Sequence, residues 1–167
     1  MEYRIIANIF SFIGAILVAY STFSKKKEKM FFIQSLDTLA YAFSNLFIGS
    51  YSGVSTNILS SIRNYLNSKN KNNKYINTIL ILLIVIIGII TNQKGLIGFI
   101  PIIASVEYTI FSLISKDVQD VRIILCINLA LWFIHDSIMG LYPALIMDVV
   151  IFVITLFNYI KIKKRGC

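Results

Sequence analysis

Charged residues are scarce in this sequence. They make up 14% of its 167 residues, whereas hydrophobic residues make up 57%. A typical soluble domain is about 25% charged and about 45–50% apolar. A chain of this length has too little interior to hide such an excess of apolar side chains. The composition therefore excludes an ordinary soluble protein, and it predicts a multi-helix membrane protein whose main partner is the lipid bilayer.

Residues that build catalytic and metal sites are equally rare. The chain has two cysteines, Cys126 and Cys167, and one histidine, His135. Two isolated cysteines exclude a disulfide framework and give no metal-ligand spacing, and the sequence contains no glycine-rich phosphate loop. We therefore expect no catalytic residue, no metal and no cofactor, and we do not expect an enzyme. The length also leaves no room for a catalytic domain beside the apolar segments.

Seven hydrophobic segments follow one another with only short loops between them. A membrane-spanning helix needs about 20 residues, and each segment approaches that length: 4–23, 30–49, 51–67, 75–92, 96–115, 120–139 and 141–160. The predicted fold class is an all-α polytopic membrane protein with seven transmembrane helices. Segment 51–67 is the most polar, so a simple hydropathy scan would miss it, and six spans are the alternative. The first segment is not expected to be a removable signal peptide, because no small-residue cleavage site precedes Lys25.

The basic residues favour seven spans over six. The formal net charge is +8, and 16 lysine and arginine residues supply the positive charge. With seven spans and the amino terminus outside, only Arg4 and Lys94 fall on the outer side. The others form four groups on the inner side: 25–29, 63–74, 116–122 and 161–165. This asymmetry is the positive-inside pattern, so we predict a cytoplasmic carboxyl terminus. No basic stripe lies on a soluble face, and no nucleic-acid partner is expected.

The two halves of the chain resemble each other when one is shifted by 91 residues. The shift pairs polar and aromatic residues: Asp37 with Asn128, Tyr41 with Trp132, Asn45 with Asp136, and Asn57 with Asp148. It predicts three helices, one linker helix and three more helices. Because a single helix separates the triplets, they are parallel and related by an axis along the membrane normal. The corresponding domains are 1–70, 71–94 and 95–167.

Segments 30–49 and 120–139 each carry a stripe of polar and aromatic residues on one helix face. Charged groups inside a membrane are costly and usually face a cavity or a partner, so we expect a central polar pocket between the two triplets. The predicted solute-binding residues are Asn57, Asp148, Trp132, Tyr41, Asn128 and Asp37. We expect Asn57 and Asp148 to hydrogen-bond the solute and the two aromatic rings to stack against it. Asp37 and Asn128 are expected deeper, toward the cytoplasm.

Four more polar residues are candidates for gating or proton-linked roles: His135, Asp136, Asn45 and Glu107. The first three are expected near the outer mouth of the pocket. Histidine titrates near neutral pH, so His135 together with Asp136 would gate the pocket or sense protons. Glu107 has no charged counterpart in the first half, and it is either a cavity residue or a protonated buried acid.

The same polar residues also fit a structural interpretation. Small and amide side chains hold helices together in membranes, and this role is favoured for the serines of 51–67. For Asn57 and Asp148 the two roles are open. Asp37 either faces a pocket or pairs with Arg63, whose long side chain would otherwise reach toward the cytoplasmic membrane surface.

Short motifs in both halves are similar to a known family. The stretch Leu46-Phe47-Ile48-Gly49-Ser50-Tyr51-Ser52-Gly53 is followed by Asn57 and by Ser61-Ile62-Arg63-Asn64, and the second half contains Trp132-Phe133-Ile134-His135-Asp136. These motifs resemble the YgjV-type bacterial inner membrane proteins over nearly the whole chain, a resemblance that implies no particular solute. The parallel repeat resembles the SWEET/PQ-loop superfamily of small-solute transporters. The PQ dipeptide is absent, since neither Pro101 nor Pro143 precedes glutamine, and most of the hinge prolines of SWEET-type transporters are missing.

The residues and the resemblance together favour a small-solute transporter or facilitator in a bacterial inner membrane. Acids exceed bases within the segments, which favours a cationic or neutral solute over an anionic one. The alternative is a non-transporting receptor or assembly protein on the same fold. The oligomeric state is open, although the chain holds both halves of the pocket and a monomer would suffice.

Overall fold

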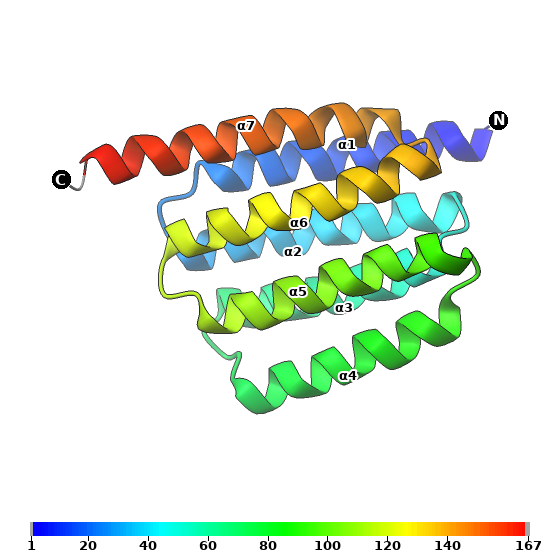
Figure 1. Cartoon of the computed structure of the whole chain (residues 1–167), viewed down its shortest axis with the longest axis horizontal. Helices are drawn as coiled ribbons and strands as arrows, with labels where there is room; N and C mark the ends of the chain where they lie inside the picture. Colours follow the sequence, from blue (N-terminus) through cyan, green and yellow to red (C-terminus); the bar gives the residue numbers. More distant parts are fainter. Residues whose placement is uncertain (1, 166–167) are drawn as a thin grey trace.

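The computed structural model describes residues 2–165, with side chains described up to Lys161, so Cys167 and the basic side chains at 163–165 lie outside the described part. Within it, the chain folds into seven α-helices and one short 3-10 helix (Figure 1): α1 Glu2–Thr22, α2 Lys27–Phe47, α3 Tyr51–Ser68, α4 Lys74–Thr91, η1 Gly95–Gly98, α5 Phe99–Ile114, α6 Val118–Met139 and α7 Tyr142–Arg165. Each hydrophobic segment predicted from the sequence is thus a helix. The boundaries differ by a few residues, and a 3-10 turn precedes α5.

Consecutive helices run in opposite directions, so their loops gather at two ends of the bundle (Figure 1). We call one of these the basic end, because it carries the lysines of 25–29, 69–74 and 116. The opposite end carries Arg4 and Lys94. The charge asymmetry that the sequence predicted between alternate loops is therefore an asymmetry between the two ends of the folded bundle.

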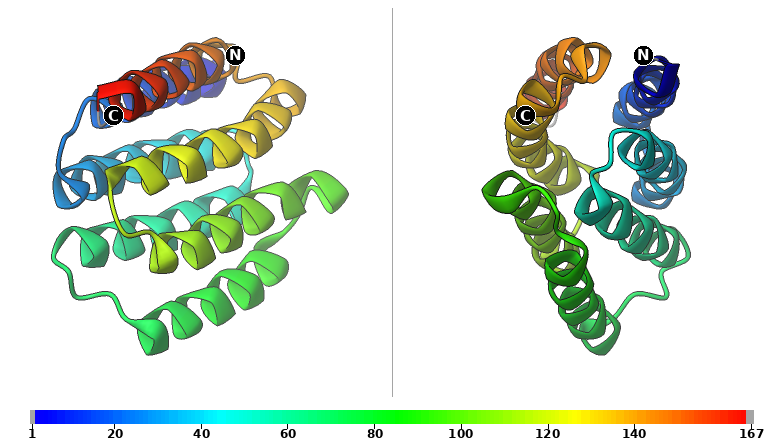
Figure 2. Two further views of the ribbon diagram at one scale, coloured as in Figure 1. Left: turned by 60° about the vertical axis from the view of Figure 1, so that its left-hand side comes forward. Right: turned by 90° about the vertical axis from the view of Figure 1, so that its right-hand side faces the viewer.

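Seen along the helices, α1, α2 and α3 form one layer and α5, α6 and α7 form a second layer (Figure 2). The layers meet where α3 packs on α5 and α1 packs on α7, and α2 touches α6 across the middle. Helix α4 packs outside this ring, against α3 and α5. Exchanging α1 with α5, α2 with α6 and α3 with α7 leaves the set of packed pairs among these six helices unchanged.

Local sequence sets both ends of α6. The Asp117 carboxylate accepts hydrogen bonds from the N–H groups of Gln119 (2.7 Å) and Asp120 (3.1 Å). The Asp120 carboxylate accepts one in return from the Asp117 N–H, which completes a capping box. At the other end Gly140 has φ 73°, a left-handed conformation that glycine adopts without strain. These two signals fix the length of α6 and hence the depth of its polar stripe.

The polarity of the bundle is inverted relative to a soluble protein. On α2 the outward stripe is apolar and 40–51% exposed: Phe32, Leu36, Leu39, Phe43 and Leu46. The inward face of the same helix buries Gln34, Asp37 and Asn45, none of them more than 3% exposed. Soluble proteins rarely expose contiguous apolar patches and almost never bury a charged side chain without a partner. The surface of this bundle therefore suits an apolar solvent.

Five helical stretches among the described residues are long and apolar enough to cross a membrane: Glu2–Thr22, Lys74–Thr91, Gly95–Ile114, Val118–Met139 and Tyr142–Lys161. Helices α2 and α3 fall short because one face of each is polar. From the sequence, this low hydropathy was predicted for segment 51–67 but not for segment 30–49. The count of seven spans stays a prediction.

Candidate functional site

A cavity of about 70 Å³ is lined by side chains from both helix layers. This volume is large enough for a few water molecules. Seven of the residues singled out in the sequence line it: Asp37, Tyr41, Asn57, Asn128, Trp132, Asp136 and Asp148. The other three candidates, Asn45, Glu107 and His135, are not part of the lining. Residues that lie 91 positions apart in the sequence therefore meet around one space.

Several polar atoms of the lining have no hydrogen-bond partner within the described part of the chain. These atoms are Asp37 Oδ2, Asp148 Oδ2, Asn57 Nδ2 and Gln34 Nε2. Each of the four side chains is at most 4% exposed. A buried polar group without a partner costs about 1–3 kcal/mol, so native proteins keep few of them. At the cavity wall, two acceptors and two donors thus lack a partner among the described residues.

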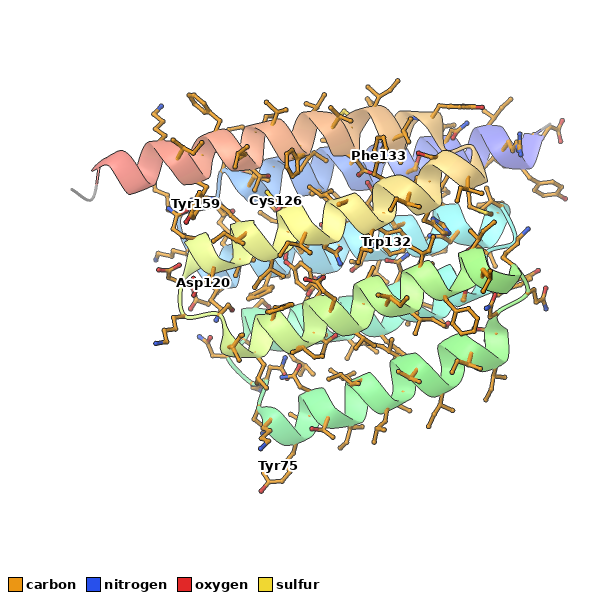
Figure 3. The ribbon with its side chains drawn as sticks, in the orientation of Figure 1. Tyr75, Asp120, Cys126, Trp132, Phe133 and Tyr159 are labelled. Carbon is orange, nitrogen blue, oxygen red and sulfur yellow. The ribbon has the colours of Figure 1, made fainter. Side chains whose placement is uncertain are left out.

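Tyr41 and Trp132 supply the aromatic part of the lining, one from each layer. Tyr41 packs closely against α1 at Gly14, where a Cβ atom would lie 2.9 Å from Tyr41 Cε2. Trp132 lies on α6 (Figure 3), with its ring edge-on to that of His135 and the two centroids 5.3 Å apart. Both rings are therefore positioned by neighbouring residues that lie outside the cavity lining.

Asn128 and Glu107 bind each other and join α6 to α5. Asn128 Nδ2 donates to the carbonyl oxygen of Ala104 at 2.8 Å and to Glu107 Oε2 at 3.2 Å. The second carboxylate oxygen of Glu107, Oε1, has no partner in the described part. Glu107 is half-buried and lies behind Asn128 rather than in the cavity lining, so its expected role as a cavity residue has no support in this geometry.

Arg63 belongs to the cavity lining, although the sequence interpretation favoured a structural role for it. Its Nη1 donates to the Ser105 carbonyl oxygen (3.1 Å) and to Thr109 Oγ1 (2.9 Å). Its Nε and Nη2 both donate to Asn64 Oδ1, at 3.1 and 3.0 Å. The guanidinium carbon lies 4.6 Å from the centroid of the Tyr108 ring, a cation–π contact. Arg63 therefore ties α3 to α5.

This geometry corrects both structural expectations for Arg63. The side chain is only 2% exposed, so it does not reach the surface of the bundle. It forms no ion pair with Asp37, because the ion pair found among the described residues is His135 with Asp136. A usable signal was present in the sequence: Ser60, Arg63 and Asn64 have the spacing of one helix face, which Asn57 also shares.

His135 and Asp136 form a buried pair near the end of α6. His135 Nδ1 lies 2.8 Å from Asp136 Oδ1, and His135 Nε2 lies 3.4 Å from Ser50 Oγ in the other layer. The His135 side chain is fully buried, whereas Asp136 reaches the cavity. Asn45 Nδ2 donates to the Tyr41 carbonyl oxygen at 3.0 Å. The pair thus links the cavity to the turn between α2 and α3.

Two reciprocal contacts fasten the layers together at the basic end. Arg122, near the start of α6, donates from Nη2 to the carbonyl oxygens of Thr22 (2.9 Å) and Ser24 (3.2 Å) at the end of α1. Lys27, at the start of α2, donates from Nζ to the Ser115 carbonyl oxygen (2.6 Å) at the end of α5. Helix carboxyl ends have unpaired carbonyls and partial negative charge, so cations suit both places. Sequence reasoning counted these residues only as orientation signals.

Asp148 also borders a second hollow. An apolar groove of about 370 Å³ between α6 and α7 is lined by Asp148 together with side chains such as Phe133, Val149 and Phe152. Val149 is 50% exposed on the outer surface, so Asp148 lies between that surface and the interior cavity. Among the described residues, no cluster of three or more His, Cys, Asp or Glu side chains is placed to hold a metal ion.

Comparison with known proteins places this architecture in a family. A model of the Imp-YgjV family, described as bacterial inner membrane protein, matches residues 5–166. No curated protein and no solved structure was found to match the chain. The family match spans nearly the whole bundle and agrees with its apolar exterior. The chain therefore belongs to the Imp-YgjV family of bacterial inner membrane proteins.

Proposed function

We propose that this inner membrane protein is a small-solute transporter or facilitator whose solute binds in the cavity between the two helix layers. The observation that carries the proposal is the set of unpaired polar atoms in that cavity, from Asp37, Asn57 and Asp148. A protein that used these residues only to hold helices together would pair them with one another. A transported solute supplies the missing partners and leaves again, which suits a site that the protein does not satisfy by itself.

All seven helices are proposed to span the membrane, including α2 and α3. Helix α3 has the same inverted polarity as α2: Ile58 and Ile62 are 43% and 46% exposed, whereas Asn57 and Arg63 are at most 3% exposed. Mean hydropathy averages the polar and the apolar face, so it underestimates how well such a helix suits a membrane. The lipid contacts only the outward face, which is apolar.

The two triplets are proposed to form a SWEET-like parallel repeat around an axis along the membrane normal. The support is the symmetry of the packed pairs, in which α1, α2 and α3 exchange with α5, α6 and α7. The residue pairs related by 91 positions agree with this exchange, since Asn57 and Asp148 both line the cavity from third helices of their triplets. One chain then completes the site without a second copy.

The basic end is proposed to face the cytoplasm, in accord with the positive-inside rule. In that orientation Arg122 and Lys27 join the triplets on the cytoplasmic side, and they act as a gate that must part for release of solute inward. His135, Asp136 and Asn45 lie toward the periplasmic side and are proposed to control the other entrance. Transport then consists of the two triplets separating alternately at the two ends.

A non-transporting receptor or assembly protein is the second candidate. The observation in its favour is the cluster around Arg63, where polar groups bond helices to one another: Asn64 Nδ2 donates to the Gln34 carbonyl oxygen at 3.1 Å, and Ser61 Oγ donates to the Ser35 carbonyl oxygen at 2.7 Å. These bonds join α2 and α3 and need no solute. If the cavity serves packing alone, its remaining polar residues contribute to folding in the same way.

Uptake into proteoliposomes tests the proposal. We expect the purified protein to accelerate entry of at least one radiolabelled solute from a panel of glycerol, urea and ethanolamine. The variants Asn57→Ala and Asp148→Ala should abolish that acceleration, because each removes a polar group that faces the cavity.

Two neighbouring residues provide matched controls. Ile58→Ala and Val149→Ala alter the same helices on their outward faces, where the side chains are 43% and 50% exposed. Both controls should transport like the unmodified protein. Full activity in Asn57→Ala and Asp148→Ala overturns the pocket assignment, and folded protein that accelerates no solute of the panel counts against transport.

A further inference from the structure

The cavity is acidic, and its acids differ in how they are engaged. Asp37, Asp136 and Asp148 all line it, and Arg63 is the basic residue in the lining. Asp136 is bonded to His135 at 2.8 Å. Arg63 donates its hydrogen bonds to uncharged oxygens of Asn64, Ser105 and Thr109. Among the carboxylates that line the cavity, those with an unpaired oxygen in the described part are Asp37 and Asp148, one from each layer.

A metal ion does not suit this arrangement. Hard cations such as Ca²⁺ and Mg²⁺ require about six or more oxygen ligands at short distance. Among the described residues no three His, Cys, Asp or Glu side chains are close enough together to hold a metal ion. The lining also contains the rings of Tyr41 and Trp132 and the unpaired amide donors of Gln34 and Asn57. These groups suit a polyatomic cation that also has an atom able to accept a hydrogen bond.

We propose that the cavity binds a small organic ammonium ion bearing one hydrogen-bond acceptor, with Asp148 and Asp37 as its carboxylate partners. The N–H groups of the ammonium donate to the carboxylates of Asp148 and Asp37. The acceptor takes a hydrogen bond from Asn57 Nδ2 or Gln34 Nε2, and Trp132 and Tyr41 offer their ring faces to the positive charge. This inference rests on the proposed function, because it names the class of solute for the same cavity.

The volume of the cavity limits how large the organic ammonium ion can be. About 70 Å³ is room for a few water molecules, which excludes sugars and large metabolites in this conformation. Ethanolammonium has the required ammonium, a hydroxyl acceptor and a suitable size. Ethylene glycol has nearly the same shape but no charge, and glycolate has the opposite charge, so the three form a matched set of probes.

Trp132 makes the test direct. It is the single tryptophan of the chain and it lines the cavity, so its fluorescence reports on that site without a label. Full-length protein in lipid nanodiscs is titrated with ethanolammonium chloride, ethylene glycol, sodium glycolate and sodium chloride. We expect a saturable change in Trp132 emission with ethanolammonium and no saturable change with the other three.

Variants locate the binding. Asp148→Asn and Asp37→Asn should each weaken ethanolammonium binding about tenfold or more, the usual loss for a hydrogen bond to a charged group. Glu2→Gln removes the same charge at an exposed position and should bind like the unmodified protein. A variant that elutes as aggregate in size exclusion is replaced by Asp→Glu at the same position, which retains the charge but displaces it.

The outcomes separate this inference from the proposed function. A saturable response to ethylene glycol or to sodium chloride equal to that of ethanolammonium overturns the inference, as does unchanged binding in both aspartate variants. Transport of glycerol or urea without ethanolammonium binding overturns the inference and leaves the transporter proposal standing. Ethanolammonium binding that needs Asp148 but produces no uptake in liposomes supports the inference and overturns transport.

Discussion

The cavity is lined by two sets of polar groups that are equally buried but differently bonded. Toward the basic end, Arg63 donates to three neighbouring residues and Tyr108 Oη donates to Gln34 Oε1 at 2.7 Å. Toward the opposite end, Asn57 Nδ2 and Asp148 Oδ2 have no partner in the described part of the chain. All of these side chains are at most 4% exposed. Burial is therefore the same for the bonded and the unpaired groups, and only their hydrogen bonding differs.

This difference separates the groups that bond the helices to one another from the groups that are proposed to bind a ligand. Removing one partner of a buried hydrogen bond leaves the other unsatisfied, at a cost of about 1–3 kcal/mol. Removing a group that has no partner carries no such cost. Substitutions of the bonded groups should therefore destabilise the fold, and substitutions of the unpaired groups should impair binding while leaving stability nearly unchanged.

The largest effect is expected for Arg63→Leu. The change leaves Asn64 Oδ1 without its donor and removes one donor each from Thr109 Oγ1 and from the Ser105 carbonyl, which keeps the 2.6 Å hydrogen bond from Thr109. It also removes the contact with the Tyr108 ring. We expect the free energy of unfolding to fall by about 3 kcal/mol, measured from denaturation in mixed detergent micelles by circular dichroism. Arg4→Leu at the exposed amino-terminal end is the control and should change stability by less than about 0.5 kcal/mol. Equal losses in both variants would contradict a structural role for the Arg63 cluster.

Two asparagines test the comparison of bonded and unpaired groups, with an expected stability effect of intermediate size. Asn128 donates to the Ala104 carbonyl and to Glu107, whereas Asn57 Nδ2 has no partner in the described part. Asn128→Leu should lower the free energy of unfolding by about 1–2 kcal/mol, and Asn57→Leu, of similar shape, by less than about 0.5 kcal/mol. If the same unfolding measurement gives Asn57→Leu the larger loss, Asn57 is a packing residue and the receptor or assembly alternative gains support.

Much of the fold was accessible from the sequence because lipid imposes simple rules. The length of each apolar run predicts each helix, and glycines such as Gly140 mark the turns where φ is positive. Helix α2 shows where averaging fails, since its outward Phe and Leu residues and its inward polar residues cancel in mean hydropathy. The polarity of one helix face, rather than of the whole segment, indicates which side is buried. The spacing of Asp37, Tyr41 and Asn45 identifies that face.

The candidate site was accessible only in part. Helical spacing and the 91-residue pairing were enough to single out residues such as Asp37, Asn57 and Asp148, which the fold brings to one cavity. Hydrogen bonds between side chains of different helices could not be predicted from the sequence, because they depend on how helices such as α3 and α5 pack. Arg63 therefore lacked its partners in the sequence interpretation. Lys27 and Arg122 illustrate the same limit, since their acceptors are backbone carbonyls about 90–100 residues away, which no side-chain pattern encodes.

The sharpest contrast is expected between two aspartates that line the same cavity. Asp136→Asn disturbs the 2.8 Å contact with His135, so it should lower the free energy of unfolding by about 1 kcal/mol or more. Asp148→Asn replaces a carboxylate whose Oδ2 has no protein donor by an amide of the same shape. Burying a charged group without a partner is costly, so this variant should be as stable as the unmodified protein or more stable by up to about 1 kcal/mol. Thermal unfolding of both variants is compared with ethanolammonium titrations of the same samples. A stable Asp148→Asn variant that no longer binds ethanolammonium identifies a site maintained for a ligand at the expense of stability. A destabilised Asp148→Asn variant shows instead that Asp148 stabilises the fold.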